Sequence, residues 1–264
     1  MLGLGNTLSG GIVPAAAGPT PDFADDKSLA FDGANDYVDI SGFKFTNENI
    51  SISFWAKPAT PGHGEVLIGG YVDLATDSWF KRFLLRYNSP EGVGFAFGDG
   101  TNNWGYLTGD VNFTDDTWHH WVMTTGVGPS TPYTGAPLIF YMDGVEVFDI
   151  ADVGGSGLVG SSTDLGLYIS KGPSGTSTWT GNINDVAFFD TVLTAAQVAA
   201  MYNSGDPTDL RVNAGDYDAK DNLTGYWWFG DEDTFPTITD RSGNGNDGTL
   251  VNMVEADMEE DVPS

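Results

Sequence analysis

The chain has 264 residues, enough for one large β domain or two small ones, and 40% of these residues are apolar. Its 37 acidic and 10 basic residues give a formal net charge of −27, which disfavours nucleic acid and anionic membrane surfaces as partners. Cysteine is absent, which excludes disulfides and thiolate chemistry, and no apolar run is long enough to span a bilayer.

Residues 1–22 form an arm that is rich in Gly, Ala and Pro. A segment of this composition cannot bury enough apolar surface to build a core of its own. We therefore expect it to dock on the domain or on a neighbouring subunit, as an assembly arm. Its contacts would come from the small set of larger apolar side chains, which are Met1, Leu2, Leu4, Leu8, Ile12 and Val13.

From Ser28 onward the pattern is typical of short β-strands. The segment 28–40 alternates and carries turn residues in its middle. In 50–58, ISISFWAKP, the residues Ile50, Ile52 and Phe54 fall on one face, and Ser51, Ser53 and Trp55 on the other. Residues 138–150 indicate a hairpin, because Asp143-Gly144 suits a tight type I′ turn. Further strands are expected at 165–170 and 179–189.

One short helix is predicted after these strands. Thr194 and Gln197 have the spacing of a capping box, and Leu193 and Val198 that of a hydrophobic staple. Because Val198, Met201 and Tyr202 share a face, the helix should lie against the sandwich, and Asn203 and Gly205 should end it.

The last segment, 206–264, begins with a polar linker at 206–222 and ends in an acidic tail. Between them lie an aromatic strand, a Gly/Asn-rich turn and another short strand. This is too little to fold alone. We expect it to add strands to the main sandwich, formed by residues 23–205, or to pair with a neighbouring copy.

Six segments occur together in an order that resembles the laminin-G-like jelly-roll family of the concanavalin A-like lectin/glucanase superfamily. They are SLAFDGANDYVDI, ISISFWAKP, TWHHWVMT, IFYMDGVEV, LYIS and WTGNINDVAFFDTVLTAAQVAAMY. The resemblance implies an all-β fold, a two-sheet antiparallel jelly-roll sandwich with one short helix. GYWWF and TDRSGNGNDGTLVN look like the segment that normally opens such a domain. Their position after it suggests a permuted arrangement or the stump of a second repeat.

The chain as a whole also resembles virion structural proteins of marine bacteriophages. The features that carry this resemblance are the MLGLGN start, the single domain, and the NGTLVN-like trailer ending in DVPS. It implies a particle surface as the location, and other virion subunits as partners.

The strands expected from the sequence carry no catalytic signature. Glucan-cutting enzymes of the superfamily carry E-x-D-x-x-E on one strand, which places two glutamates on one side. Here Glu48, Glu65, Glu91 and Glu146 are isolated from one another. His119 and His120 are adjacent on a predicted strand, so they should point to opposite faces. We therefore predict a non-enzymatic protein.

The acid excess has two interpretations, solubility in a salty medium and divalent-cation binding, for which Asp and Asn supply hard oxygen ligands. The resemblance implies a site, where present, between the FDGANDYV region and the G-x-I-D-D-V strand. The matching residues here are Asp32, Asn35, Asp36 and Asp185, and the expected ion is Ca²⁺. Alternatively, Asp32-Gly33 is a turn and Asp185 a surface group. Asp240, Ser242 and Asn244 echo the start of an EF-hand loop, with an Asx turn as the alternative.

Glycan binding requires a flat aromatic ring that stacks on a sugar, with polar groups for the hydroxyls. The segment 97–110, expected to be a loop, supplies Trp104 and Tyr106 beside Asp99, Asn102 and Asn103. Tyr71, Trp79 and Trp179 are alternative platforms. All these aromatics could instead serve as core or subunit contacts, because tryptophans in a β-sandwich are mostly buried.

Three hypotheses for the function follow. The first is a structural, lectin-like subunit displayed on a particle surface, as capsid decoration or fibre of a bacteriophage, with homo-oligomeric contacts and cell-surface glycans as further partners. The second is a freestanding carbohydrate-binding module, which would be monomeric and extracellular. The third is a glycosidase with an unfamiliar acid pair.

Overall fold

The fold is that of a computed structural model. The described residues are 23, 25–43, 49–60, 62–71, 82–88, 92–98, 103–109, 111, 113–126, 137–150, 166–172, 178–230 and 233–264. The expected assembly arm, 1–22, lies outside them.

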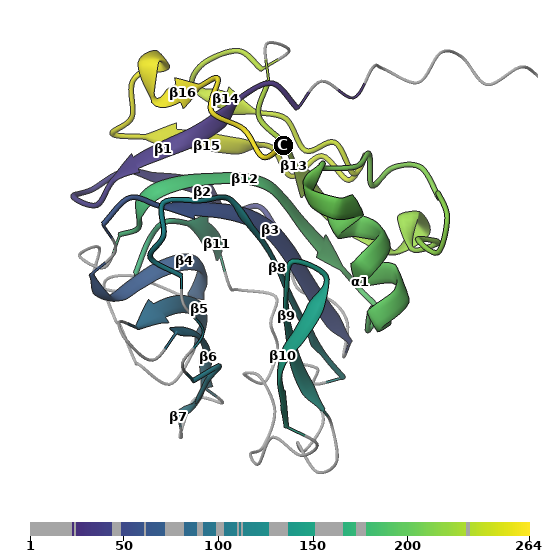
Figure 1. The fold of residues 1–264 in the computed structure, drawn as a ribbon. Coiled ribbons are helices and arrows are strands. Elements are labelled where there is room, and N and C mark those ends of the chain that lie inside the picture. Colours follow the sequence, from purple (N-terminus) through teal and green to yellow (C-terminus); the bar gives the residue numbers. More distant parts are fainter. Residues whose placement is uncertain are drawn as a thin grey trace, which may run out of the picture.

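Two antiparallel sheets are packed face to face (Figure 1). In spatial order, the first sheet contains β10 (Val145–Ile150), β9 (Leu138–Met142), β8 (His119–Thr125), β3 (Ile50–Pro58), β12 (Thr180–Phe189), β1 (Ser28–Asp32) and β16 (Met258–Glu259), and β13 (Leu223–Trp227) also pairs with β12. The second sheet contains β14 (Thr237–Ile238), β15 (Gly248–Val251), β2 (Tyr37–Ile40), β11 (Gly166–Ile169), β4 (His63–Tyr71), β5 (Arg82–Asn88), β6 (Gly92–Gly98) and β7 (Asn103–Leu107).

The core lies between the inner faces of these sheets, as a two-layer sandwich requires. It joins residues of the first sheet, such as Phe54 and Trp121, to residues of the second, such as Ile68 and Leu85, in one buried cluster. The expected all-β, two-sheet jelly-roll class is therefore confirmed. The segment 28–40 contributes one strand to each sheet, because the turn at residues 33–36 carries the chain from β1 to β2.

Strand β3 shows how the alternation is used. Ile50, Ile52 and Phe54 belong to the core, as predicted. On the other face the Ser51 hydroxyl donates to the Thr191 carbonyl at 2.7 Å, and the Ser53 hydroxyl lies 2.8 Å from His120 Nε2. Both faces of β3 are buried. Something must therefore cover the outside of the first sheet.

That cover is an outer layer, defined here as residues 193–222. It contains the helix α1 (Ala195–Tyr202) and the 3₁₀ turns η2 (Asn203–Gly205) and η3 (Lys220–Asn222). The capping box of Thr194 and Gln197 is present, and Asn203 ends α1 in the left-handed region, as predicted. Together with the first sheet and β13, this layer encloses a second apolar cluster, which includes Val198, Met201, Leu210, Tyr226 and Trp228. Figure 1 shows α1 alongside β12 and β3, away from β4–β7.

The C-terminal segment completes both sheets. β13 pairs with β12, whereas β15 and β16 pair with β2 and β1, the two strands that begin the sandwich. The 3₁₀ turn η4 (Glu255–Asp257) leads into β16. The tail is fastened by Asp261, whose carboxylate accepts hydrogen bonds from Lys57 Nζ at 2.9 Å and from Trp118 Nε1 at 3.0 Å. Within the described ranges, no helix has the length and apolar character needed to cross a membrane.

Candidate functional site

Three of the residues proposed for glycan contact, Asn103, Trp104 and Tyr106, belong to the last strand in the second sheet. Trp104 and Tyr106 belong to β7, where their backbones pair with Phe97 and Phe95 of β6. The expectation of a loop is therefore wrong for residues 103–107. Aromatic residues favour extended backbone, and β6 offers an edge with which they can pair. Asp99 and Asn102 lie outside the described residues, as do the side chains of Asn103, Trp104 and Tyr106.

Among the alternative platforms, Trp179 is closed to a ligand. Its ring is fully buried and stacks on Phe113 with 5.6 Å between the centroids, inside the core. Tyr71 is the last residue of β4, with its side chain outside the described part, and Trp79 lies outside it entirely. Trp104 and Tyr106 thus remain the aromatic candidates.

The four residues proposed as metal ligands fall into two places. Asp32 pairs with Thr180, whereas Asp185 lies beyond Ile183, which pairs with Leu29. Asp185 comes five residues after Thr180 along β12, so about 16 Å of strand separates it from the position opposite Asp32. Asp32 Oδ1 accepts from the Ala34 amide at 2.8 Å, as in an Asx turn. The structure therefore does not bring Asp185 together with the other three.

Asp36 and Asn35 belong to the same turn as Asp32. Asp36 Oδ2 accepts from the Asp32 amide at 3.3 Å, and the Asn35 carbonyl accepts from Asn252 Nδ2 at 2.8 Å. Within the ranges that the structure describes, no three His, Asp or Glu side chains are grouped in a way that could hold a metal ion.

The EF-hand-like turn is occupied by the chain itself. Asp240 Oδ1 accepts from the amides of Tyr226 and Ser242, and Oδ2 accepts from the amide of Asn246 at 2.9 Å. These bonds fasten the Gly/Asn-rich turn to β13. They match the alternative of an Asx-type turn rather than a cation loop.

A buried acid pair, Asp25 and Asp185, lies instead beside the junction of β1, β12 and β13. Strand β12 pairs with β1 up to Ile183 and with β13 from Val186 onward. Between these stretches the register shifts against β3, and Asp185 has a φ of 53°. Such a bulge re-aims a side chain. Here it directs Asp185 into the protein, where only 3% of the residue is exposed.

Asn184 connects the two acids. Its Nδ2 donates to Asp25 Oδ1 at 2.5 Å, and its Oδ1 accepts from the Asp185 amide at 2.8 Å. The hydroxyl of Tyr226, from β13, lies beside the Asp185 carboxyl and donates to the Thr208 carbonyl at 3.3 Å. Residues before β1 reach this place because Lys27 forms a bridge with Phe229, just after β13.

Burial dominates the electrostatics of this pair. It raises the pKa of Asp185 well above its usual range, and the charge of Asp25 adds to the effect. Burial also raises the pKa of Asp25 to about 7, against the lowering effect of the Asn184 hydrogen bond. Arg211 and Arg241 lie in the same region over the Trp228 ring, where they bond Asp209 and Asp233.

The two histidines face opposite ways, as predicted. His120 is buried against Trp55 and, from α1, Tyr202, and burial lowers its pKa to about 3. His119 lies toward Phe113, and its Nδ1 is 2.7 Å from Asp143 Oδ2. Although burial acts to lower it, the pKa of His119 is raised by its bonds with Asp143 and Asp115.

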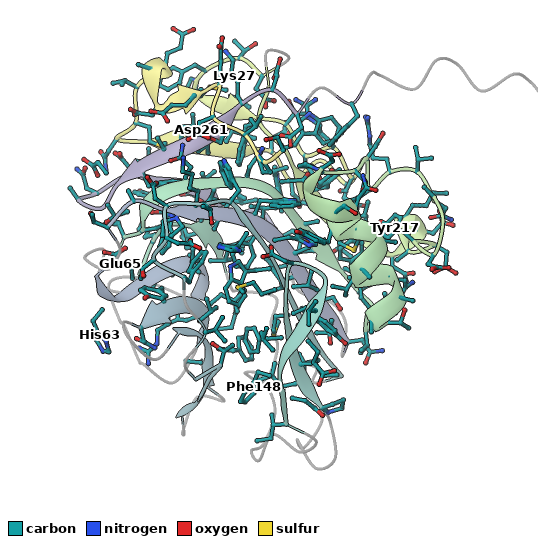
Figure 2. All side chains as sticks on the ribbon, in the orientation of Figure 1. Lys27, His63, Glu65, Phe148, Tyr217 and Asp261 are labelled. Carbon is teal, nitrogen blue, oxygen red and sulfur yellow. The ribbon has the colours of Figure 1, made fainter. Side chains whose placement is uncertain are left out.

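Of the four isolated glutamates, the structure describes the side chains of Glu65 and Glu146, and these two lie in different sheets. Glu65 accepts from the amides of Thr180 at 3.0 Å and Gly62 at 2.7 Å, so it fastens β4 to β12. Glu146 lies on β10 and is exposed. Figure 2 shows Glu65 and His63 on the opposite side of the molecule from Tyr217.

Tyr217 forms part of the wall of a cavity of about 620 Å³ between α1 and residues 208–217. Tyr217 is itself buried, and Asp209 in the same wall is bonded to Arg211. The cavity therefore has no exposed Tyr217 ring on which a sugar could stack, and its Asp209 carboxylate is already bonded to Arg211.

The sequence model of one family covers most of the sandwich. The family described as the concanavalin A-like lectin/glucanases superfamily matches residues 32–199. The chain belongs to this superfamily. The lectin-like domain thus extends from the end of β1 through most of α1, while Asp25 and Tyr226 lie outside the matched range.

Relatives of this lectin-like domain occur in larger proteins. The chain is 23% identical over 195 residues to adhesion G-protein coupled receptor V1 of Danio rerio, and this match covers 70% of the chain and 3% of the receptor. The chain therefore spans a small part of the curated relative that it matches.

Solved structures share the fold at low sequence identity. The CBM40 of Ruminococcus gnavus IT-sialidase, bound to α2,3-sialyllactose, has a TM-score of 0.54 at 10% identity, covering 67% of this chain and 96% of that one. The NanB sialidase of Streptococcus pneumoniae has a TM-score of 0.54 at 15% identity, covering 72% of this chain and 30% of that one.

Proposed function

We propose that this lectin-like domain binds carbohydrate and does not catalyse its cleavage. The observation that carries the proposal is membership of the superfamily, together with an aromatic edge strand, β7, in the second sheet. A carbohydrate-binding module is among the structures that share the fold. The one E-x-D-x-x-E string in the sequence, Glu255–Glu260, runs through the 3₁₀ turn η4 and the two-residue strand β16 instead of lying along one strand, which supports a binding role over a hydrolytic one.

Trp104 and Tyr106 are the residues to which we assign sugar stacking, with Asp99, Asn102 and Asn103 as partners for hydroxyl groups. Residues two apart on a strand share a face, so the two rings can form one platform. Trp104 lies nearer the start of β7. Tyr106 pairs with Phe95, which belongs to the core. We expect Trp104, which has the larger ring and pairs with Phe97 farther along β6 from the core residue Phe95, to contribute more to binding than Tyr106.

The test is a glycan array probed with the full chain at saturating Ca²⁺. We expect a defined set of glycans to retain the protein, and Trp104→Ala to abolish retention. Tyr202→Ala is a suitable control, because Tyr202 is an aromatic of α1, across the molecule from β7 (Figure 1). An array without hits would contradict the proposal. Hydrolysis of a polysaccharide, lost on changing one carboxylate, would replace it with the glycosidase hypothesis.

We further propose display of the domain on a bacteriophage virion, as capsid decoration or fibre, rather than as a freestanding extracellular module. The support is the sequence resemblance to virion proteins and the composition of the arm 1–22. Deleting the arm should abolish self-association and incorporation into particles while glycan retention persists. A monomer with an intact arm would favour the freestanding module.

A further inference from the structure

Three hydrogen-bond donors form a row across the outer side of the first sheet. Lys57 of β3 pairs with Asn182 of β12, and Trp118 lies just before β8, the other neighbour of β3. The adjacent residues Ala56 and Ile183 belong to the core, so Lys57 and Asn182 point away from it. An ammonium group, an indole N–H and a carboxamide can all donate to carboxylates. We call Lys57, Trp118 and Asn182 the donor row.

Two carboxylates of the tail strand, defined here as residues 258–264, bind to the donor row. Glu259 Oε2 accepts from Asn182 Nδ2 at 3.1 Å. Asp261, which lies near β1 in Figure 2, accepts from the other two donors at 2.9 and 3.0 Å. These bonds raise the pKa of Lys57 and, against the effect of burial, lower the pKa of Asp261. The row therefore binds two acids that are two residues apart.

The backbone of the tail strand is recognised as well. Its first two residues form β16, which pairs antiparallel with β1 at the edge of the first sheet. Addition of a strand to a sheet edge is a general mode of peptide recognition, in which backbone bonds give affinity and side-chain contacts give specificity. An acidic sugar has carboxylates but no backbone that could pair with β1. The ligand that matches the site is therefore an extended Glu-x-Asp strand.

Little buried surface holds the tail strand in place. From Val254 to Ser264 only Pro263 is buried, and the side chain of Asp261 is 42% exposed. Exposed ion pairs contribute little to stability, so this segment can open at a small cost compared with unfolding of the sandwich. Its advantage is the covalent connection, which gives a tethered ligand an effective concentration on the order of millimolar. A second acidic strand at a similar local concentration can therefore compete for the row.

We propose that the donor row is a binding site for an extended acidic strand, and that it exchanges its own tail strand for that of a second copy of this chain. Every copy carries both the row and the sequence that the row binds, so exchange forms between copies the contacts found within one chain. Because a formal charge of −27 opposes non-specific association of copies, the exchanged contact has to be specific. The site is separate from the arm 1–22 and from β7.

Two complementary full-length variants test the exchange. Glu259→Gln/Asp261→Asn keeps the row and weakens the strand, whereas Lys57→Met/Trp118→Phe keeps the strand and weakens the row. Sedimentation velocity at pH 7 should show a 1:1 complex in the equimolar mixture, at least about tenfold tighter than the association of either variant alone. The complex should persist when the arm 1–22 is deleted from both chains. A mixture that associates no more than its components would overturn the exchange, and so would loss of the complex with the arm.

A labelled peptide with the sequence of residues 255–264, EADMEEDVPS, gives a readout that does not require two chains to associate. By fluorescence anisotropy, the variant Glu259→Gln/Asp261→Asn should bind the peptide at least about tenfold more tightly than the wild type, whose row is already occupied by its own strand. The peptide with the same two substitutions should not bind.

A matched chain carrying Asp216→Asn, at an exposed position, should behave as the wild type in this assay. Equal peptide binding by Lys57→Met/Trp118→Phe and by Glu259→Gln/Asp261→Asn would place the contact elsewhere and overturn the site. Displacement of the peptide by an oligogalacturonate at equal concentration would also overturn it, because the row would then recognise acidic sugars instead of a strand.

Discussion

The outer faces of the two sheets differ in what is buried on them. On the first sheet, the outer layer and β13 enclose an apolar cluster of thirteen buried residues. On the second sheet, the corresponding cluster among the described residues contains three, Val66, Leu84 and Ala96, with Tyr168 packed against them. Among the described residues, the outer face of the first sheet is thus covered more extensively than the outer face of the second. The following predictions compare the two.

The largest effect is expected from Trp228→Ala. Trp228 is buried, contacts Tyr226 and Phe23, and has the guanidinium groups of Arg211 and Arg241 each 4.4 Å from its ring centre. Removal of a buried tryptophan typically costs about 3–5 kcal/mol. Urea unfolding at pH 7 should show a loss of this size. A loss below about 1 kcal/mol would mean that the outer layer contributes little to stability.

Leu84→Ala is the matched change on the second sheet. Leu84 is buried in the small cluster, where fewer neighbours surround it. We expect a loss near the lower end for a leucine truncation, about 2 kcal/mol, in the same urea experiment. A loss equal to that of Trp228→Ala would remove the energetic difference between the two outer faces.

The pH dependence of stability should distinguish the contributions of His120 and Asp25, which both lie on the outer side of the first sheet. The depressed pKa of His120 means that its contribution is lost as pH falls from 6.5 toward 3. The raised pKa of Asp25 acts oppositely: its favourable contribution is complete below about pH 4 and is lost as pH rises through about 7. In metal-free protein the two slopes therefore oppose each other between pH 6.5 and 4.

Asp25→Asn removes one of these slopes. The variant should lose stability on acidification more steeply than the wild type, by up to about 1.4 kcal/mol per pH unit. Urea midpoints measured at pH 6.5, 5.5 and 4.5 check this, with Asp216→Asn, at an exposed position, as the control. Parallel curves for wild type and Asp25→Asn would show that Asp25 does not exchange a proton in this range.

The smallest effect is expected from Thr194→Ala. Its hydroxyl accepts from the Gln197 amide at 3.3 Å, and the Gln197 side chain accepts from the Thr194 amide. Loss of a helix cap costs about 1 kcal/mol, and this cap lies at an exposed position. Thr194→Ser keeps the hydroxyl and should restore the urea midpoint. If it does not, the cap is not the cause.

Local signals in the sequence predicted much of this fold. The Asp143-Gly144 turn has positive φ angles at both residues and closes the β9–β10 hairpin. The capping box and the alternation of β3 also follow from neighbours in the chain. These features are predictable because they are decided within a few residues.

The site residues were harder to predict because ladder register decides them. The residues near Asp185 in the sequence do not show that Asp185 lies five residues along β12 from Thr180, the partner of Asp32. They also do not show that β12 changes its partner from β1 to β13 beside Asp185. Asp25 belongs to no recognisable sequence motif, and it lies only three residues after the arm 1–22. Trp104 was predicted to lie in a loop because glycines surround it in the sequence. The strand β7 is recognised only from its pairing with β6. Long-range pairing overrides local preference in each case.

The most direct test of the central claim, sugar binding at the β7 edge, is calorimetric titration with a soluble fragment of a glycan retained on the array. The wild type should bind, and Trp104→Ala should bind about tenfold more weakly at unchanged urea midpoint, the loss expected for one stacked ring. Tyr202→Ala, in α1, should keep the wild-type Kd. Full affinity in Trp104→Ala would contradict the account.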